Sequence, residues 1–439
     1  MLSIVIPVRD RSLLLDKVLR SLSRQTLATE HFEVIVVDDG STEDLSDAIR
    51  GIDVPFSLEV LRLPTNVGRA AARNAGARRA RGDVLVFLDA DSLAHPELLA
   101  RHAEGHRRDP DRRDVVVGTR FEINLAELDT WERSGRISAT SLTLVEADLR
   151  AVYLAEHGPA IWEGCGWTLA YTHNVSLRRA VFFEAGGFDE ALRGWGLEDQ
   201  ELFYRVAKVL GPAGRFCYEP SAICYHLPHL RDPIAEWRER VDNIQIAKRT
   251  HLDGEFELFC AMPLLAFLRA RSYYASLHAY LALGSFAHGG RPWVTSCLSS
   301  VARCLYQGRA GFPDPERMPA GLMTLDPSQP RSETNLHLLG LGTPFEDKDF
   351  DLVVSHDVWR FLKWRELLRF LDEAERIAHR LILIRSKSAR ATDVPGGLTM
   401  AMDTAYLARE LSLRHAQVLS MQDDEVQAIE IVFAPSASA

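Results

Sequence analysis

The sequence predicts an α/β protein whose first half is a mostly parallel sheet flanked by helices. Short apolar runs alternate with helical patterns, and acidic residues directly follow several of the runs. The expected strands are 2–8, 33–37, 58–63, 84–88 and 115–118, and the clearest helices between them are 13–22 and 68–81. This β-α-β-α order implies parallel strands that bind ligands at their carboxyl ends, so we expect the chemistry there.

The composition is that of a globular chain. Of the 439 residues, 46% are hydrophobic and 26% charged, and the formal net charge is −10. An acidic balance without a long basic tract argues against a nucleic-acid partner. At about 150 residues per domain, the length predicts two or three domains.

No segment indicates export or a membrane anchor. The longest uncharged apolar runs stay below the roughly 18 residues of a transmembrane helix, and the apolar N-terminus lacks the basic region of a signal peptide. The six cysteines have neither C-x-x-C spacing nor the density of a disulfide scaffold. We expect a cytoplasmic location, with peripheral attachment to the inner membrane face as the alternative.

The strand 84–88 runs directly into Asp89 and Asp91. Two carboxylates at i and i+2 can converge on one divalent cation, because a strand returns every second side chain to the same side. A solvated turn is the alternative for a single Asp-x-Asp. Acidic residues also follow the strands at 2–8 and 33–37, and such clusters repel unless a cation or a ligand's hydrogen-bond donors compensate them. A nucleotide with a metal-held diphosphate supplies both.

Asp39 and the turn at 66–69 complete the expected nucleotide side. Asp39 is placed to accept a hydrogen bond from a uracil-like imide or a ribose hydroxyl; its alternative is an N-cap for the helix after Ser41. The residues Asn66-Val-Gly68-Arg69 precede a helix, which brings backbone N–H groups and a guanidinium to the same crevice.

Residues 1 to about 230 resemble the family-two glycosyltransferases of the GT-A fold. The motifs that carry the resemblance are Ile4-Val-Ile-Pro7-Val-Arg9, Val36-Val-Asp-Asp39-Gly-Ser41, Asn66-Val-Gly68-Arg69 with Arg73-Asn74-Ala-Gly76, and Phe87-Leu-Asp89-Ala-Asp91. The resemblance implies transfer of a sugar from a nucleotide-diphosphate donor with inversion, aided by Mn²⁺ or Mg²⁺. It implies metal ligation by Asp91, with Asp89 near ribose and metal, and donor contacts from Pro7, Arg9, Asp39, Gly68, Arg69 and Asp89.

The stretch Gly194-Trp-Gly-Leu-Glu-Asp-Gln-Glu201 resembles the acceptor-side motif of galactosyl- and N-acetylgalactosaminyl-type transferases. Trp195 offers a flat apolar face of the kind that stacks on sugar rings. Acidic residues in a first helical turn also complement the helix dipole, which is the alternative explanation. An inverting displacement needs one carboxylate beside the acceptor nucleophile, and the family's pattern makes Asp199 that base, with Glu198 holding a sugar hydroxyl.

A histidine beyond the base is the usual third metal ligand of this family. His226 follows a strand-like run in the expected place, and His229 is its competitor. Where relatives commonly carry a glycine two residues before the asparagine, this chain has Thr172-His173-Asn174, so a reshaped donor pocket is expected. Trp162, Trp167 and His173 are candidates for the choice of sugar; for both tryptophans a place in the core is the alternative.

Four segments are expected: a catalytic domain at 1–230, a helical extension at 231–306, a proline-rich linker at 307–335 and an α/β module at 336–439. The extension either packs on the catalytic domain or between subunits, or forms a membrane-surface helix or an acceptor-binding lid. In the last segment we expect strands at 336–341, 350–355, 380–384, 414–421 and 426–433, with helices near 358–378 and 399–411.

Residues 343–355, with the helix and strand that follow, resemble the second half of a class I S-adenosylmethionine methyltransferase. Asp326 would imitate its ribose-binding acid, whereas Gly308-Arg-Ala-Gly311 is a poorly formed version of its glycine-rich turn. We therefore expect a degenerate, non-catalytic module that serves dimerisation or acceptor capture.

The principal hypothesis is an inverting, metal-dependent enzyme that moves a sugar from a UDP-sugar to a hydroxyl or thiol. A bifunctional glycosyltransferase and methyltransferase is the alternative, and a scaffold without catalysis disagrees with the presence of Asp89, Asp91 and Asp199. The acceptor stays open among glycan, lipid, natural product and peptide. The helical or C-terminal part is a candidate for homodimer formation.

Overall fold

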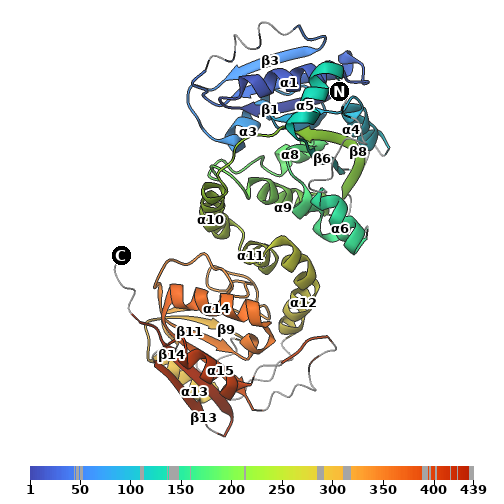
Figure 1. The fold of residues 1–439 in the computed structure, drawn as a ribbon. Coiled ribbons are helices and arrows are strands. Elements are labelled where there is room, and N and C mark those ends of the chain that lie inside the picture. Colours follow the sequence, from blue (N-terminus) through green and yellow to red (C-terminus); the bar gives the residue numbers. More distant parts are fainter. Residues whose placement is uncertain are drawn as a thin grey trace. The chain divides into compact units, whose positions relative to one another are not determined.

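The computed structural model divides into two compact units, Met1–Ile246 and Ala247–Ala439, which we describe one at a time (Figure 1). The structure describes residues 1–43, 45, 49, 53–108, 113–135, 137, 148–158, 160–211, 214–283, 291–309, 318–387, 394, 397–400, 403–415, 417–422 and 424–434. The border between the units divides the segment for which a helical extension was expected. The four-segment division remains a prediction.

The first unit is built on an eight-stranded sheet of order β3-β2-β1-β4-β7-β6-β8-β5. Its strands are β1 Leu2–Val8, β2 Phe32–Asp38, β3 Ser57–Arg62, β4 Val84–Leu88, β5 Ser92–Ala94, β6 Val115–Glu122, β7 Asn174–Arg178 and β8 Phe216–His226. Strands β1 to β4 are parallel, whereas β7 runs antiparallel to both β4 and β6. All five strands expected in this half are present, and their carboxyl ends bring the motif residues to one edge.

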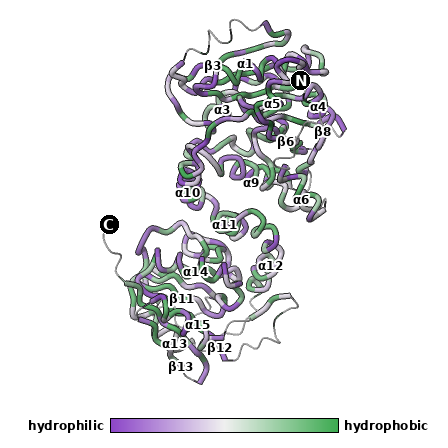
Figure 2. Tube along the Cα trace, viewed as in Figure 1, coloured by the Kyte–Doolittle hydropathy of each residue, from purple (hydrophilic) through white to green (hydrophobic). Residues whose placement is uncertain are grey.

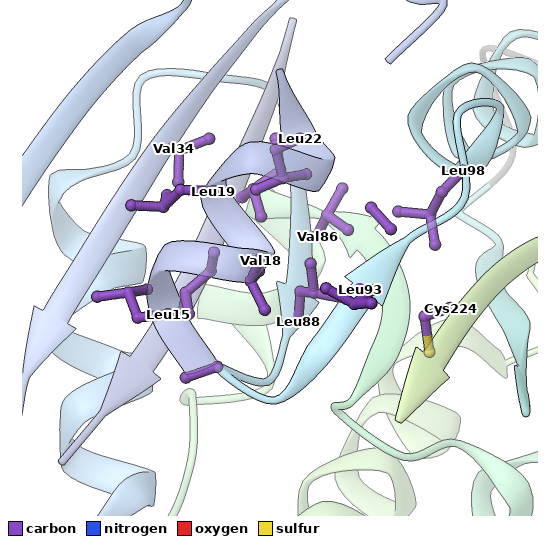
Figure 3. Close-up of a cluster of buried hydrophobic side chains, with 14 of the residues drawn as sticks. Leu15, Val18, Leu19, Leu22, Val34, Val86, Leu88, Leu93, Leu98 and Cys224 are labelled. Carbon is purple, nitrogen blue, oxygen red and sulfur yellow. The ribbon is translucent and has the colours of Figure 1, made fainter. Parts of the chain in front are cut away.

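This unit also contains helices. They are α1 Ser12–Leu22, α3 Arg69–Arg79, α4 Leu98–Arg107, α5 Leu125–Ser134, α6 Leu149–His157, α7 Ala160–Cys165, α8 Arg179–Glu184, α9 Glu198–Leu210 and α10 Pro233–Thr250, with short 3-10 turns at Thr29–His31 and Gly166–Leu169. The apolar stripe of α1 lies among Val34, Val86 and Leu88 of the sheet, as Figure 3 shows. Side chains of this kind, removed from water, supply most of the stabilisation of such a unit.

Helix α3 lies unusually close to the sheet because of Gly76. A Cβ on this glycine would lie 2.5 Å from Cγ1 of Val5 and 3.0 Å from Cγ2 of Val37. Only glycine permits this approach. The same close packing holds the first turns of α3, with Arg69 and Arg73, at the carboxyl ends of β1 and β4.

The second unit contains a six-stranded sheet of order β10-β9-β11-β12-β14-β13. Its strands are β9 Arg303–Gln307, β10 Gly321–Leu325, β11 Phe350–His356, β12 Ala378–Ser386, β13 Gln417–Gln422 and β14 Val426–Val432; its helices are α11 Gly254–Ala261, α12 Leu264–Ala282, α13 Arg291–Ser299, α14 Trp364–Ile377 and α15 Thr404–Ser412, with a 3-10 turn at Val358–Phe361. Strand β14 is antiparallel to both neighbours, and β9 to β12 are parallel. Strands β9 and β10 occupy residues expected as the end of the extension and as linker.

The strand predicted at 336–341 is wrong. These residues form a loop whose backbone is bound by a side chain: the carboxylate of Glu257 accepts hydrogen bonds from the N–H groups of Leu339, Leu341 and Gly342, at 2.5, 2.6 and 3.1 Å. The apolar pattern reflects burial of Leu336, Leu338, Leu339 and Leu341. Glu257 binds backbone N–H groups that strand pairing would otherwise satisfy. These leucines can therefore be buried although the segment is not a β-strand.

Among the described residues, no helix combines the length and the apolar character that crossing a bilayer requires. Hydrophilic residues recur along the long helices, as the colouring of α10 illustrates in Figure 2.

Candidate active site

A buried arginine, Arg73, joins the two acidic motifs of the first unit. Its side chain extends from α3 and is 2% exposed. Nη2 donates to Oδ1 of Asp89 at 2.9 Å, and Nη1 lies 3.6 Å from Oε1 of Glu198 and 3.7 Å from Oδ1 of Asp199. Burial opposes the charge of Arg73, yet the nearby carboxylates raise its pKa above the usual value. The carboxyl end of β4 and the first turn of α9 therefore face each other across one guanidinium.

Asp199 is held by Thr172 as well as by this charge. The Thr172 hydroxyl donates to Oδ1 at 2.7 Å and the Thr172 N–H donates to Oδ2 at 3.1 Å. Burial and the neighbouring Glu198 raise the pKa of Asp199 to about 7, whereas Arg73 and the Thr172 hydroxyl act in the opposite direction. A carboxyl group with a pKa near the working pH is suited to accept and release a proton.

The backbone before α9 is strained in a way that fixes this carboxylate. Gly194, Gly196 and Leu197 have φ values of +75°, +90° and +78°. Left-handed backbone is unfavourable for a residue such as Leu197, and it persists only where the surroundings enforce it. Helix α10 does so: Oε2 of Glu239 accepts from Trp195 N–H at 2.7 Å, and the Asn243 side chain donates to the Gly196 carbonyl at 2.8 Å.

A second cluster lies beyond the end of β4. Asp91, His226 and His229 each offer one ligand atom, and these atoms lie within 4.8 Å of one another. Asp91 Oδ2 is 3.6 Å from His226 Nε2 and 3.6 Å from His229 Nδ1, and the buried Asp91 Oδ1 has no hydrogen-bond partner. Although burial acts against it, the two histidines lower the pKa of Asp91 to about 2, so the group is a carboxylate. An unpartnered buried oxygen beside two imidazoles fits a divalent cation.

The second nitrogen of His226 is also engaged. Its Nδ1 lies 2.7 Å from Oε2 of Glu122, and the Arg120 Nε donates to the other oxygen of Glu122 at 2.8 Å. A carboxylate behind a metal-ligating histidine typically fixes the ring and directs the remaining nitrogen to the ion. Arg231 reaches the opposite side, where its guanidinium is 2.9 Å from His226 Nε2 and 3.3 Å from His229 Nε2.

The predicted donor residues gather at the same edge. Asp39 accepts hydrogen bonds from the N–H groups of Val67 and Gly68, at 2.7 and 3.0 Å, and so holds the turn that begins α3. The neighbouring Asp38 accepts a hydrogen bond from Ser41 N–H at 2.8 Å. Most of the helix expected after Ser41 falls outside the described residues.

The remaining predicted positions are spread around this edge. Pro7 lies in β1, Arg9 follows that strand with its Nε 3.6 Å from the Asp10 carboxylate, and Arg69 Nη1 lies 3.7 Å from Glu198. Trp195 is half-buried between the two glycines. Asp89, expected near ribose and metal, bonds Arg73 and is outside the Asp91–His226–His229 cluster.

Both tryptophans considered for sugar choice are buried. Trp162 stacks on Tyr218 with ring centroids 5.3 Å apart, and Trp167 packs on Tyr204 at 4.8 Å. His173 is half-buried and lies 2.9 Å from a guanidinium nitrogen of Arg150. These contacts favour the core alternative for both tryptophans.

Three roles were not predicted from the sequence: the bridge by Arg73 and the clamp by Thr172, although both residues stand in the quoted motifs, and the support from Glu122. Arg73 lies four residues after Arg69 and so shares its helix face, which is why both were expected near the same crevice. Thr172 and Glu122 belong to no spacing pattern with the residues they contact, at 27 and 104 positions' separation, and only the fold reveals them.

The comparisons with known proteins agree with this geometry. Residues 3–182 match the model "Glycosyl transferase family 2", and residues 163–230 match "N-terminal domain of galactosyltransferase". Validoxylamine A glucosyltransferase from Streptomyces hygroscopicus subsp. jinggangensis is 31% identical over 427 residues, covering 87% of this chain and 96% of that protein. The chain belongs to glycosyl transferase family 2.

Other glycosyltransferases match a smaller part of the chain. An uncharacterised glycosyltransferase from Haemophilus influenzae is 42% identical over 224 residues, covering 51% of this chain and 68% of that protein. Among solved structures, a mannosyltransferase from Pyrobaculum calidifontis in complex with GDP-Man and Mn²⁺ is 18% identical, with a TM-score of 0.44 and coverage of 67% of this chain and 79% of that chain.

The predicted α/β class with a GT-A glycosyltransferase domain and a smaller C-terminal sheet is confirmed, and the protein is a glycosyltransferase. The comparisons give no support to the methyltransferase resemblance of the C-terminal segment, which remains a prediction.

Proposed function

We propose that this family 2 glycosyltransferase moves a sugar from a UDP-sugar to a hydroxyl or thiol acceptor with inversion, and that Asp199 is the general base. The observation that carries the proposal is the placement of Asp199: it opens α9, is held by Thr172 and faces Asp89 across Arg73. Asp199 is therefore near the acidic residues expected to serve the donor, but Arg73 separates it from them.

In this mechanism Asp199 accepts the proton of the acceptor as its oxygen or sulfur attacks the anomeric carbon opposite the leaving diphosphate. The Thr172 hydroxyl and N–H keep both carboxylate oxygens oriented. The positive charge of Arg73 offsets the repulsion between Asp89 and Asp199. Trp195, half-buried in its glycine-rich turn, offers a stacking face to a sugar ring.

Asp91, His226 and His229 would hold Mn²⁺ or Mg²⁺. Such an ion stabilises the negative charge that develops on the leaving diphosphate. The inclusion of His229 extends the sequence prediction, in which it competed with His226. Glu122 supports this set by fixing the His226 ring, and Asp39 and Gly68 lie where a nucleoside would be bound.

The test is release of UDP by the purified chain from UDP-glucose, UDP-galactose and their N-acetyl forms, with manganese and with a chelator. UDP-glucose is the first donor to test and validoxylamine A the first acceptor, because the relative's name states a glucosyl group and validoxylamine A. We expect manganese-dependent release from one UDP-sugar. A rate unchanged by the chelator would contradict the role of the metal, and turnover of a GDP-sugar instead would contradict the uridine donor.

We propose further that the C-terminal unit is non-catalytic. The carboxylate of Asp326, at the end of β10, accepts from the backbone N–H and the hydroxyl of Ser328 at 2.9 and 2.6 Å, so it caps its own turn. Gly311 of the poorly formed glycine-rich turn lies outside the described residues. Calorimetry with S-adenosylmethionine is expected to give no binding heat, and a saturable isotherm would revive the bifunctional alternative.

A further inference from the structure

The two edges of the C-terminal sheet are finished differently. At the β10 edge, Thr324 N–H donates to the Thr334 carbonyl and the Thr324 carbonyl accepts from Leu336 N–H, both at 2.8 Å. At the other edge lies β13, whose inner side pairs with β14 from Gln417 opposite Val432 to Gln422 opposite Gln427 (Figure 1). Across the described residues, no strand pairs with the outer side of β13.

This open edge lacks the features that usually keep sheet edges apart. Natural proteins protect an edge strand with charged residues, proline or a bulge. Strand β13, Gln-Val-Leu-Ser-Met-Gln, has neither a charged residue nor proline or glycine, and it pairs with β14 in a continuous register. Leu419 at its centre is 56% exposed. The strand is therefore suited to accept a further strand.

The charges on either side of β13 identify the partner. Arg414 and His415 precede the strand, and Asp424 and Glu425 follow it; all but the half-buried His415 are exposed. When two identical strands pair in antiparallel fashion, the start of each lies beside the end of the other. Arg414 of one copy then lies near Asp424 of the second, which favours a second copy of this chain. Arg414 also contacts Asp372 of α14, and the two side chains remain 44% and 49% exposed.

We propose that two copies of this glycosyltransferase associate through β13, across a two-fold axis at Ser420, and join their six-stranded sheets into one. Opposed side chains must lie on the same face of a sheet, so such an axis passes through a residue and not between two. An axis at Ser420 places Leu419 opposite Met421 of the partner subunit. Met421 already packs on the buried cluster that includes Leu298 and Cys304. Each contact between Leu419 and the partner's Met421 would therefore cover the exposed Leu419 with an apolar side chain.

The first test is the molar mass of the full chain by light scattering at micromolar concentration. The parent is expected to have twice the mass of the 49.2 kDa chain, and Leu419→Lys is expected to have the mass of one chain. Leu413→Lys is the matched control: Leu413 is 80% exposed but lies outside the strand, so this variant stays dimeric. Thermal unfolding followed by circular dichroism checks that both variants are folded.

A pair of cysteine variants tests the register. Ser420→Cys faces its own symmetry mate and is expected to form a disulfide-linked dimer on mild oxidation, above the background of the parent's cysteines. Leu419→Cys faces methionine and is expected not to do so. A monomeric parent overturns the proposal, as does a dimer that survives Leu419→Lys; cross-linking at position 419 but not 420 overturns the register. UDP release, measured in parallel, reports on the proposed function independently.

Discussion

Two buried carboxyl groups, one in each unit, have nearly the same acidity and opposite surroundings. Burial raises the pKa of Asp199 to about 7 and that of Glu257 to about 7. Glu257 is 2% exposed, and its oxygens accept from three backbone N–H groups of one loop. The Asp199 side chain keeps 15% of its surface exposed and faces the buried cation of Arg73.

The difference teaches that a shifted pKa does not locate a catalytic residue by itself. The carboxyl oxygens of Glu257 accept hydrogen bonds from the backbone of the loop 339–342. Glu257 therefore fixes that loop and has no access to substrate. Asp199 is oriented by Thr172 but retains contact with solvent and with the motif acids. The predictions below separate these two roles.

The largest expected effect is on turnover. Asp199→Asn removes the proton acceptor, and general-base catalysis is worth roughly 10²- to 10⁴-fold, so the transfer rate should fall by about that factor. UDP affinity, measured by calorimetry, should stay within a few fold. Equal loss of both would show that Asp199 is structural. Glu257→Gln is the matched control and should leave the turnover of folded enzyme unchanged.

Metal affinity should respond next. His229→Ala removes a proposed ligand, and Glu122→Gln removes the support of His226, a change that typically costs 10- to 100-fold in metal affinity. We expect both variants to bind Mn²⁺ more weakly in a titration followed by electron paramagnetic resonance, with His229→Ala the weaker binder. Unchanged binding in His229→Ala would remove this residue from the site.

The third effect is on stability and falls on the other carboxyl group. Glu257→Gln turns an amide N–H₂ toward backbone donors and should lower the free energy of unfolding by about 1–3 kcal/mol. Because the folded-state pKa of Glu257 is raised, the folded chain binds its proton more tightly, and this contribution to stability is lost as pH rises from about 4.5 to about 7.

Two buried histidines change the free energy of unfolding with pH in the opposite direction to Glu257. Their contribution must be separated from that of Glu257. Burial lowers the pKa of His102 to about 4 and of His106 to about 3, so their contribution is lost as pH falls below about 6.5. Denaturant titrations of parent and Glu257→Gln across this pH range isolate the glutamate by difference. A difference that does not change with pH would contradict the raised pKa.

The sequence analysis succeeded where one local pattern decides the structure. Alternating apolar runs predicted the sheet. Asp89 and Asp91 were selected by their place after a strand, and Asp199 by the resemblance of its motif to the family's pattern. It failed at 336–341, where burial without a ladder depends on Glu257 some 80 residues earlier. Thr172 and Glu122 were missed for the same reason, since each acts on a residue that only the fold brings near. The sequence analysis treated His229 as an alternative to His226, because a sequence pattern cannot show that both histidines lie near the same carboxylate, Asp91.

The measurement that tests the central claim most directly is the pH dependence of kcat/KM for UDP-sugar turnover by the parent and by Thr172→Val. The account predicts activity that falls as pH drops through about 7, as Asp199 becomes protonated. The Thr172 hydroxyl lowers the pKa of Asp199, so its removal should move this fall to higher pH. A profile without an acidic fall, or one that Thr172→Val leaves in place, would contradict the assignment of Asp199 as the base.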